Sequence, residues 1–310
     1  MANFVLHNDE YESGYLEGVQ ENLAITSQAG FRAIKVTSEA VKGDFEKETI
    51  FTGDVTFQNR DPSGTAARNE ERLGLAENVG VKVSYNTKRQ IIPQSDLSRS
   101  GFDNMAYSNA MGRNVAQNEM KHILGISIAA AATAIGAVAT NKIAQTAAFT
   151  KKDFVEALRP LQDQAPNVVG WLAATGLGFD VLSEAIEQNR YGEAGVVYGA
   201  SAGTLNIPFM SSALPDLMNG TKQRLLALFE NAIEIKLNSS APSIVINNHD
   251  DTENHYQTWS LDGGFNLKLR NTPYVGTGGN VTRALLTTPA NWSTTGSNTN
   301  LLGTMTEFGA

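Results

Sequence analysis

The sequence predicts a mixed α+β fold, and three patterns along the chain indicate it. A helical pattern of apolar residues extends from about residue 100 to about residue 140. Short segments in which apolar and polar residues alternate precede this helix, and more of them follow from residue 194 onward. With 310 residues, 41% of them hydrophobic, the chain can form one large domain or two modest ones around a sizeable core.

The first 30 residues are acidic and show little hydrophobic periodicity. Such a segment cannot bury much apolar surface of its own, so we expect an arm that becomes ordered only against another surface. It lacks the basic region and apolar run of a secretory signal peptide. After it, alternation predicts one strand near residues 31–37 and another near residues 50–57.

Residues 50–86 are predicted to form a long two-stranded excursion with a polar tip. A dense turn signal runs from Asn59 to Gly64, and the return arm alternates cleanly through Val81, Val83 and Tyr85. Each arm would reach about 40–50 Å at the rise of a strand, well beyond the radius of gyration of roughly 20 Å expected for a compact chain of this length. Because an isolated hairpin is marginally stable in water, we expect this element to point outward and to lie on another subunit.

The longest helix is predicted over about residues 100–140, with Ser100 and Asp103 as a capping box. One possible face contains Met105 and Arg113, a second contains Met111 and Val115, and glycines within the segment make breaks possible. The uncharged stretch at 123–141 is about long enough to span a membrane, but it is dominated by Ala, Gly, Ser and Thr. We interpret it as a buried helix that lets a neighbour approach closely, and we expect no membrane contact.

The second half of the chain is predicted to be a mixture of short helices and strands. A helix follows the capping box of Thr150 and Asp153 and ends or kinks at Pro160. A buried strand is expected at 168–174 and a helix at 179–186. Further strands are expected at 195–199, 205–209, 225–237, 243–247, 255–261 and 265–270. The tail from residue 286, which is rich in Thr, Asn, Gly and Ser, is expected to be irregular.

The search for chemistry yields only weak candidates. His249, Asp251 and His255 lie in a polar segment between two predicted strands and are the candidate metal ligands. Their spacing matches no metal motif that we can explain, so we favour a solvated turn and expect no metal site. A loop at 276–280 is glycine-rich, but it does not join a strand to a helix as a phosphate-binding loop would.

A serine hydrolase is a remote alternative. Gly199 to Gly203 read G-x-S-x-G, which would make Ser201 a nucleophile. No helical pattern follows this segment, as a nucleophile elbow requires, and we interpret it as a glycine-rich turn. The chain has no cysteine, which excludes thiolate nucleophiles and cysteine-ligated zinc. We therefore predict no catalytic residues and no cofactor.

The charge balance argues against a general nucleic-acid binder. The net charge is −8 and the pI is near 5.1, whereas such binders carry a basic face. A container for nucleic acid remains compatible with this balance. The predicted tip of the excursion carries both signs of charge, and we expect intersubunit contacts from Arg60, Asp61, Arg68, Glu70, Glu71 and Arg72.

The order of these elements resembles a tailed-bacteriophage major capsid protein, the Hong Kong 97-type capsid fold that encapsulin shells also have. The stretches that carry the likeness are Gly80-Val-Lys-Val, the helix around 103–139, Val169-Gly-Trp-Leu with Phe179-Asp-Val-Leu, and Glu230-Asn-Ala-Ile-Glu-Ile-Lys236. The resemblance implies an N-terminal arm at 1–30, a peripheral-domain strand region at 31–49, an extended loop at 50–86, a peripheral domain with a spine helix at 87–164, an α/β axial domain at 165–255, and peripheral-domain strands with an irregular tail at 256–310.

The resemblance also implies a function. Subunits of this family form hexamers and pentamers of an icosahedral shell that encloses double-stranded DNA, without sequence-specific binding, inside the virion. Assembly takes place in the host cytoplasm with a portal protein, a scaffolding protein and, in some relatives, a decoration or cement protein. The short arm favours a separate scaffolding protein here. An encapsulin-like cellular compartment is the main alternative. Such a compartment needs an inner groove that docks cargo, and we cannot locate one in the sequence, so the sequence does not separate a phage shell from a cellular one.

Overall fold

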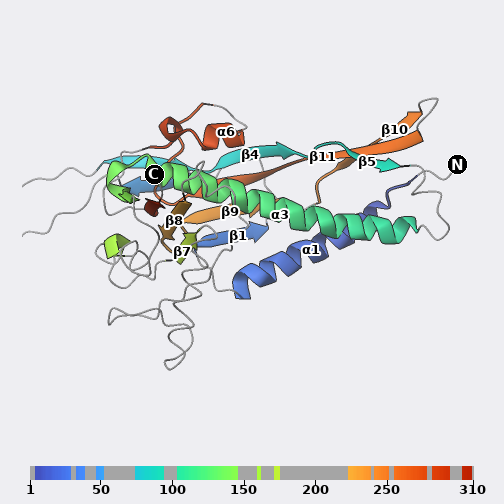
Figure 1. The fold of residues 1–310 in the computed structure, drawn as a ribbon, viewed down its shortest axis with the longest axis horizontal. Helices are drawn as coiled ribbons and strands as arrows, with labels where there is room; N and C mark the ends of the chain where they lie inside the picture. Colours follow the sequence, from blue (N-terminus) through green and yellow to red (C-terminus); the bar gives the residue numbers. More distant parts are fainter. Residues whose placement is uncertain are drawn as a thin grey trace, which may run out of the picture.

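The computed structural model describes residues 4–28, 33–38, 47–51, 74–93, 103–145, 159–161, 171–174, 223–238, 241–250, 255–277, 281–293 and 302–308. All structural statements below concern these residues. Their arrangement is elongated and mixes helices with strands, as predicted (Figure 1). A long helix, α3 (Asn104–Gly136), lies along the longest axis, and a sheet with a 15-residue strand lies beside it.

The first helix, α1 (Asn8–Gln28), packs along the first half of α3 (Figure 1). The sequence interpretation missed this helix, because acidic residues dominate the segment and hide a short apolar stripe. That stripe is Tyr11, Tyr15 and Val19, spaced four residues apart and buried against Val115 and Ala116 of α3. The segment does gain its order from another surface, but that surface belongs to the same chain.

Helix α3 confirms the predicted long helix and refines its faces. Asp103 is its N-cap, and the Asp103 carboxylate accepts a hydrogen bond of 2.9 Å from the backbone N–H of Met105. The helix continues without a break until Gly136. The face with Met111 and Val115 is buried, whereas Met105 is 49% exposed, so the other predicted face is solvated.

The larger sheet is built on β11 (His255–Leu269), which was predicted as two strands. The chain stays extended through Gly263 and Gly264, because both pair with β4 and make no turn. The inner part of β11 pairs with β9 and β4, and its outer part pairs with β10 and β5. The partners are β4 (Val81–Asn86), β5 (Gln90–Pro93), β9 (Ile233–Leu237) and β10 (Ile244–Asp250), with β1 (Ile34–Ser38) added in parallel on β9.

A smaller, four-stranded sheet corrects two predictions. Its order is β6 (Lys142–Gln145), β12 (Gly303–Phe308), β8 (Gln223–Leu228) and β7 (Trp171–Ala174). The single strand expected at 225–237 is two strands, β8 and β9, which join different sheets across a turn with Asn231 at a φ of 54°. The tail expected to be irregular supplies β12, whose six residues are all buried because it lies between β6 and β8.

A third, two-stranded sheet forms the described part of the predicted excursion. Strands β2 (Lys47–Phe51) and β3 (Leu75–Val79) pair antiparallel, as expected for the two arms of a hairpin. The return arm was predicted at Val81–Tyr85, but residues 81–86 belong to the larger sheet as β4. The excursion therefore ends at Gly80, and its return arm is β3, which was not predicted. Most of the helix expected after Thr150, the helix at 179–186 and the strands at 195–199 and 205–209 lie outside the described residues.

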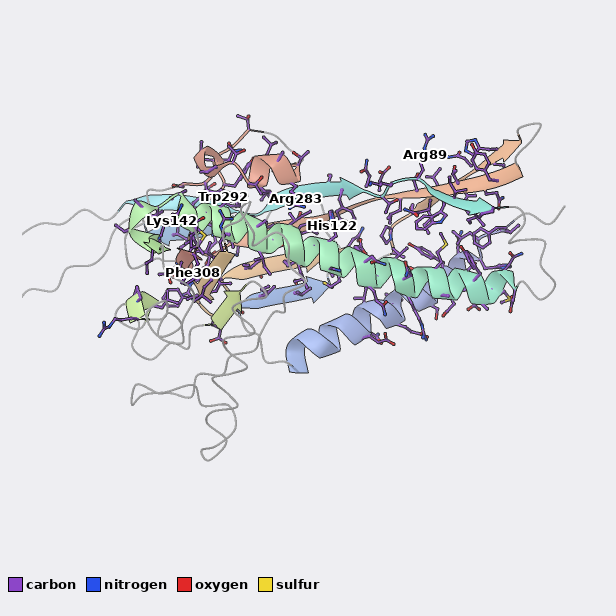
Figure 2. All side chains as sticks on the ribbon, in the orientation of Figure 1. Arg89, His122, Lys142, Arg283, Trp292 and Phe308 are labelled. Atoms are coloured by element: carbon purple, nitrogen blue, oxygen red, sulfur yellow. The ribbon has the colours of Figure 1, made fainter. Side chains whose placement is uncertain are left out.

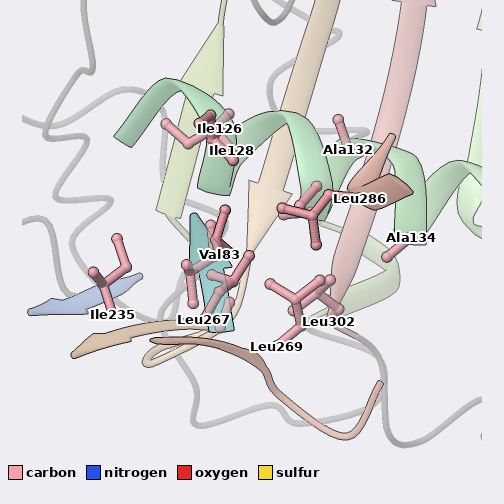
Figure 3. Packing of buried hydrophobic residues seen from close by; sticks show 14 of the residues in the cluster. Val83, Ile126, Ile128, Ala132, Ala134, Ile235, Leu267, Leu269, Leu286 and Leu302 are labelled. Carbon is pink, nitrogen blue, oxygen red and sulfur yellow. The ribbon is translucent and has the colours of Figure 1, made fainter. Parts of the chain in front are cut away.

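The main core lies between the second half of α3 and the two larger sheets (Figure 3). Ile126, Ile128 and Ala132 of α3 pack in one cluster with Val83 and Leu267 of the sheet. The short helix α6 (Arg283–Leu286), with η1 (Ala139–Asn141) and η3 (Pro289–Asn291) nearby, adds Leu286 to it. This confirms the interpretation of 123–141 as a buried segment, and no described helix is sufficiently long and apolar to cross a membrane.

Candidate assembly surface

The residues predicted to make contacts between subunits lie at the tip of the excursion, outside the described residues. They are Arg60, Asp61, Arg68, Glu70, Glu71 and Arg72. The structure does describe how the excursion begins. On β2, Ile50 is buried, whereas Leu75 at the start of β3 is 67% exposed. A large aliphatic side chain that faces water here is compatible with a surface that another molecule covers.

Ion pairs fasten the start of the excursion to the larger sheet. Lys268 of β11 lies 3.2 Å from Glu48 of β2 and 3.1 Å from Glu234 of β9. Glu234 also pairs with Lys35 of β1 at 3.4 Å. In addition, the Asn78 side chain of β3 donates a hydrogen bond of 3.0 Å to the carbonyl oxygen of Leu269. Charge and hydrogen bonding thus connect β2 and β3 to three strands of the larger sheet.

The pKa values of this cluster follow from its pairing. Burial alone would raise the pKa of Glu234, but hydrogen bonds from Lys268 and Lys35 outweigh burial and hold that pKa below its ordinary value. Burial would lower the pKa of Lys268, but Glu234 and Glu48 raise it. Both groups therefore stay charged at neutral pH, and the cluster acts as a fixed support for the excursion.

A second charged cluster holds β12 in the four-stranded sheet. The side chain of Glu307 is 4% exposed and lies 2.7 Å from Lys142 of β6 and 2.9 Å from Arg224 of β8. Burial would raise the pKa of Glu307, but the hydrogen bonds from Lys142 and Arg224 hold it below its ordinary value. Because the buried carboxylate must lie next to both cations, it favours this register of β12 over registers shifted along the sheet.

A third cluster lies where α1 crosses α3. Glu119 of α3 accepts a hydrogen bond of 2.6 Å from the hydroxyl of Tyr15 on α1, and another from the hydroxyl of Tyr85 on β4. Burial raises the pKa of Glu119 to about 7, against the opposing effect of the Tyr15 hydrogen bond. His122, one turn further along α3 (Figure 2), packs edge-on against the Tyr85 ring. The arrangement joins three elements through one carboxyl group.

The start of the chain is held by a fourth set of contacts. The side-chain amide of Gln257 accepts a hydrogen bond of 2.9 Å from the N–H of Phe4 and donates one of 3.4 Å to the carbonyl of Phe4. The Phe4 ring contacts Tyr107 of α3 edge-on, with ring centroids 5.0 Å apart. Further along, the Tyr11 hydroxyl donates to the carbonyl oxygen of Pro242 at 3.1 Å. The segment before α1 is thus fixed to the outer part of the larger sheet.

The described part of the structure does not bring the candidate metal ligands together. His249 lies on β10, where its ring stacks on Tyr256 and its Nε2 is 2.9 Å from the Thr258 hydroxyl. Asp251 lies outside the described residues, as does the side chain of His255. Within the described residues there is no group of three or more potential ligands around one point. Ser201 is also outside the described residues, so the hydrolase alternative remains a sequence interpretation.

Sequence reasoning missed the ion-pair and tyrosine clusters, although one signal was present. Glu119 is the only carboxylate in the 33 residues of α3, and it is followed at i+3 by His122. A lone acidic residue on a helix that becomes apolar a few residues later indicates a special environment. Its two tyrosine partners are 104 and 34 residues away in sequence, so no local pattern identifies them.

Known capsid structures resemble this chain at low identity. Cyanophage Pam1 capsid protein is 12% identical, with 89% of this chain and 88% of that chain covered and a TM-score of 0.49. The Mycobacterium phage Adephagia chain is 10% identical over 91% and 89%, with a TM-score of 0.48. The capsid chain of Cyanophage P-SCSP1u is 15% identical over 77% and 84%, with a TM-score of 0.43. No curated protein sequence matches this chain significantly.

The family comparison is more specific than these likenesses. A sequence model of the Gp13-like family, described as major capsid protein 13-like, matches residues 3–305. The match covers α1, α3, all of the larger sheet and the first half of β12. The chain therefore belongs to the major capsid protein 13-like family, a family of structural proteins of capsids.

Proposed function

We propose that this protein is the major capsid subunit of a tailed bacteriophage, and that it assembles into hexamers and pentamers of an icosahedral shell around double-stranded DNA. The observation that carries the proposal is the family match over residues 3–305. The elongated α+β arrangement, with a long helix beside a long sheet and a two-stranded excursion, supports a Hong Kong 97-type fold. A portal protein and a separate scaffolding protein are the further partners that we propose, with a decoration or cement protein as in some relatives.

The excursion is the part of the subunit that we propose to reach a neighbouring subunit. Its supporting ion pairs at Lys268 fix its direction relative to the larger sheet. The tip segment combines Arg60, Arg68 and Arg72 with carboxylates, so it can form ion pairs with a second copy of the same surface region. Such contacts between exposed charges weaken when salt screens them over about 10 Å at 0.1 M.

The charges of the described residues support an enclosing role over a gripping one. Lys35, Arg113, Lys142, Arg224 and Lys268 all pair with carboxylates of the same chain. Phosphate contacts by such residues would compete with these internal pairs. We therefore propose that the surface facing packaged DNA is neutral or acidic, and that isolated subunits bind duplex DNA weakly at physiological salt.

We also propose that the subunit has no catalytic centre. A capsid family of structural proteins supports this, and the only nucleophile that the sequence suggests is Ser201. Ser201→Ala should leave shell assembly unchanged, and a serine-directed covalent probe should leave the chain unlabelled. Stoichiometric labelling at Ser201 would contradict this part of the proposal.

Electron microscopy of the purified chain tests the main proposal. Closed icosahedral shells of uniform size are expected, from the chain alone or with its scaffolding protein. Deleting residues 58–72 should leave a folded, soluble subunit that forms no shells. A milder variant changes Arg60, Arg68 and Arg72 together to Gln and should reduce shell yield strongly.

The matched control for the triple variant removes three positive charges elsewhere. Lys88, Arg89 and Lys121 are exposed on described parts of the chain (Figure 2 labels Arg89), and their change to Gln should leave assembly unaffected. Equal loss of shells in both triple variants would indicate a net-charge effect rather than a specific surface. Normal shells from the 58–72 deletion would contradict the role of the excursion. Shells that purify with a cargo protein and no DNA would favour a cellular compartment.

A further inference from the structure

The junction between α1, α3 and β4 depends on a single carboxyl group. Each oxygen of Glu119 has its own tyrosine donor: Tyr15 from α1 on Oε2 and Tyr85 from β4 on Oε1. The two tyrosines come from elements that do not otherwise share a sheet or a helix pair. A change that makes the surroundings of this carboxyl group less favourable therefore weakens its contact with α1 and its contact with β4 together.

Glu119 lies between two grooves that contain charged and titratable groups. A groove of about 370 Å³ brings Lys82 of β4 and Asp262 of β11 near it. A second groove, of about 440 Å³, is lined by Lys88 and His122 as well as by Glu119. Even so, Glu119 has no ion-pair partner among the residues that the structure describes.

His122 and the neighbouring tyrosines do not supply the missing positive charge at neutral pH. Burial lowers the pKa of His122, and the nearby Arg283 lowers it further, so the imidazole stays neutral near pH 7. Burial and the charge of Glu119 raise the pKa values of Tyr11 and Tyr15, so both hydroxyls keep their protons. A negative charge on Glu119 would therefore face only neutral hydrogen-bond donors at close range.

We propose that Glu119 is a proton-controlled latch, which holds α1 on α3 while its carboxyl group is uncharged and loosens α1 when it ionises. Both protonation states can keep two hydrogen bonds, since a protonated carboxyl can donate to one tyrosine and accept from the other. The difference between the states is the buried charge. Water in the two grooves can solvate part of that charge, and fuller solvation requires one of the packed elements to move away.

The element that moves is α1, because β4 is held more firmly. Strand β4 pairs with β11 over six residues, from Val81 to Asn86. Helix α1 packs on α3 through Tyr15, Gly18 and Val19 and has one exposed ion pair, Glu17 with Arg113. Phe4 and Tyr11 fix only its beginning, and α1 forms no strand pairing that would hold it as β4 is held. Ionisation of Glu119 should therefore release the part of α1 that follows Tyr15.

The direction of the pH dependence follows from linkage. Glu119 titrates near pH 7 with α1 docked, and near the ordinary value of 4.5 when water reaches it. Docking is strongest below pH 4.5, weakens as the pH rises to about 7, and stays level above it. Helix α1 is thus held more tightly in acid than in mildly alkaline solution.

Hydrogen exchange of the full-length chain from pH 5 to pH 8 tests the latch. The protection of amides in residues 16–28 is divided by that of β11, which removes the intrinsic pH dependence of exchange. This ratio should fall roughly tenfold between pH 5 and pH 8, mostly below pH 7. In Glu119→Gln, which keeps the size and hydrogen-bonding ability of the side chain, the ratio should be independent of pH.

Glu17→Gln is the matched control, since Glu17 also lies on the α1–α3 contact but pairs with Arg113 at an exposed position. It should keep the wild-type pH profile. A pH-independent ratio in the wild-type chain, or an unchanged profile in Glu119→Gln, would refute the latch. If the Gln variant does not fold, a carbon-13 titration of Glu119 in the wild-type chain decides instead: a midpoint near pH 4.5 overturns the proposal, and one near pH 7 supports it.

Discussion

The four-stranded sheet holds a buried carboxyl group and the α1–α3 junction a half-buried one, and the two regions stabilise it differently. Glu307 in the sheet meets Lys142 and Arg224, and its pKa is held below the ordinary value against the effect of burial. Glu119 at the junction meets two tyrosine hydroxyls, and burial raises its pKa to about 7. One carboxyl group is therefore ionised throughout the neutral range, and the other titrates within it.

The geometry of the two regions explains the difference. Neighbouring strands lie about 4.8 Å apart, so long side chains on both sides of β12 can reach Glu307. Arg224 stands directly opposite Glu307 in the β8–β12 register. At the junction, α1 and α3 approach so closely at Gly112 that a methyl group there would collide with the backbone of α1. The two oxygens of Glu119 are instead occupied by neutral tyrosine hydroxyls from α1 and β4.

The strongest test of the sheet region is Glu307→Gln. This change leaves Arg224, which is 17% exposed, and Lys142 without a counter-charge. Removing one partner of a buried ion pair typically costs 3–5 kcal/mol, so we expect the free energy of unfolding to fall by about 4 kcal/mol. Urea denaturation at pH 7, followed by circular dichroism, measures it.

Glu48→Gln provides the control for that test. Glu48 also pairs with a lysine, Lys268, but its side chain is 50% exposed. Pairs at such positions contribute about 0–1 kcal/mol, so the loss should stay below about 1 kcal/mol. Equal losses in the two variants would mean that burial does not distinguish the two carboxylates.

The junction should respond to pH in the opposite sense from the sheet. The folded pKa of Glu119 lies above the ordinary value, so its contribution to stability is complete below pH 4.5 and is lost as pH rises to about 7. A shift of this size corresponds to about 3 kcal/mol, and water in the adjoining grooves reduces it to about 2 kcal/mol. Glu119→Gln should therefore be more stable than wild type by about 2 kcal/mol at pH 8 and equal to it near pH 4.5.

Urea midpoints of both chains at pH 4.5 and pH 8 check this sign. Glu307 contributes a slope of the other sign, because its folded pKa is lowered and its stabilisation is lost only as pH falls below the ordinary carboxyl range. A Gln variant that is less stable than wild type at pH 8 would show that the tyrosine hydroxyls fully compensate the charge of Glu119.

The same contrast between local and long-range contacts decides which features could be predicted from the sequence. The long helix and the strand at Val81–Tyr85 follow local periodicity, and the structure contains both. That strand was predicted as the return arm of the excursion, whereas the structure places it in the larger sheet and uses β3 as the return arm. Strand β12 does not follow local periodicity, because a six-residue segment with two threonines and a glycine resembles the polar tail around it. Its identity as a strand is decided by β6 and β8, which flank it only in the folded chain.

Local sequence patterns could not predict the charged and tyrosine clusters, for a related reason. Lys268, Glu48 and Glu234 are far apart in sequence and come together because three strands align. The acidic composition of α1 predicted an arm with little pattern. Its short stripe of Tyr11, Tyr15 and Val19 forms a buried face only because α3 packs against it. The predicted contact residues between Arg60 and Arg72 remain a proposal that rests on their charge pattern.

The smallest effect is expected from Gly112→Ala, and it tests whether the close helix crossing limits the access of water to Glu119. A methyl carbon at Gly112 would collide with the carbonyl oxygen of Tyr11 and lie 2.7 Å from the backbone nitrogen of Tyr15, so α1 must shift outward. Overpacking of this kind costs about 1–3 kcal/mol, and replacing glycine within a helix returns about 1 kcal/mol. The net loss should be about 1 kcal/mol, whereas Gly80→Ala, where the new carbon would find its nearest neighbour 3.6 Å away, should change little.

The more informative measurement combines Gly112→Ala with Glu119→Gln. If α1 moves outward, water reaches Glu119, its pKa falls toward the ordinary value, and the charge no longer destabilises the junction. The gain of about 2 kcal/mol expected from Glu119→Gln at pH 8 should then disappear in the Gly112→Ala background, which is a coupling between neighbouring sites. Additive effects of the two changes would mean that the close helix crossing does not control the pKa of Glu119, and that the grooves beside it already hydrate the carboxylate.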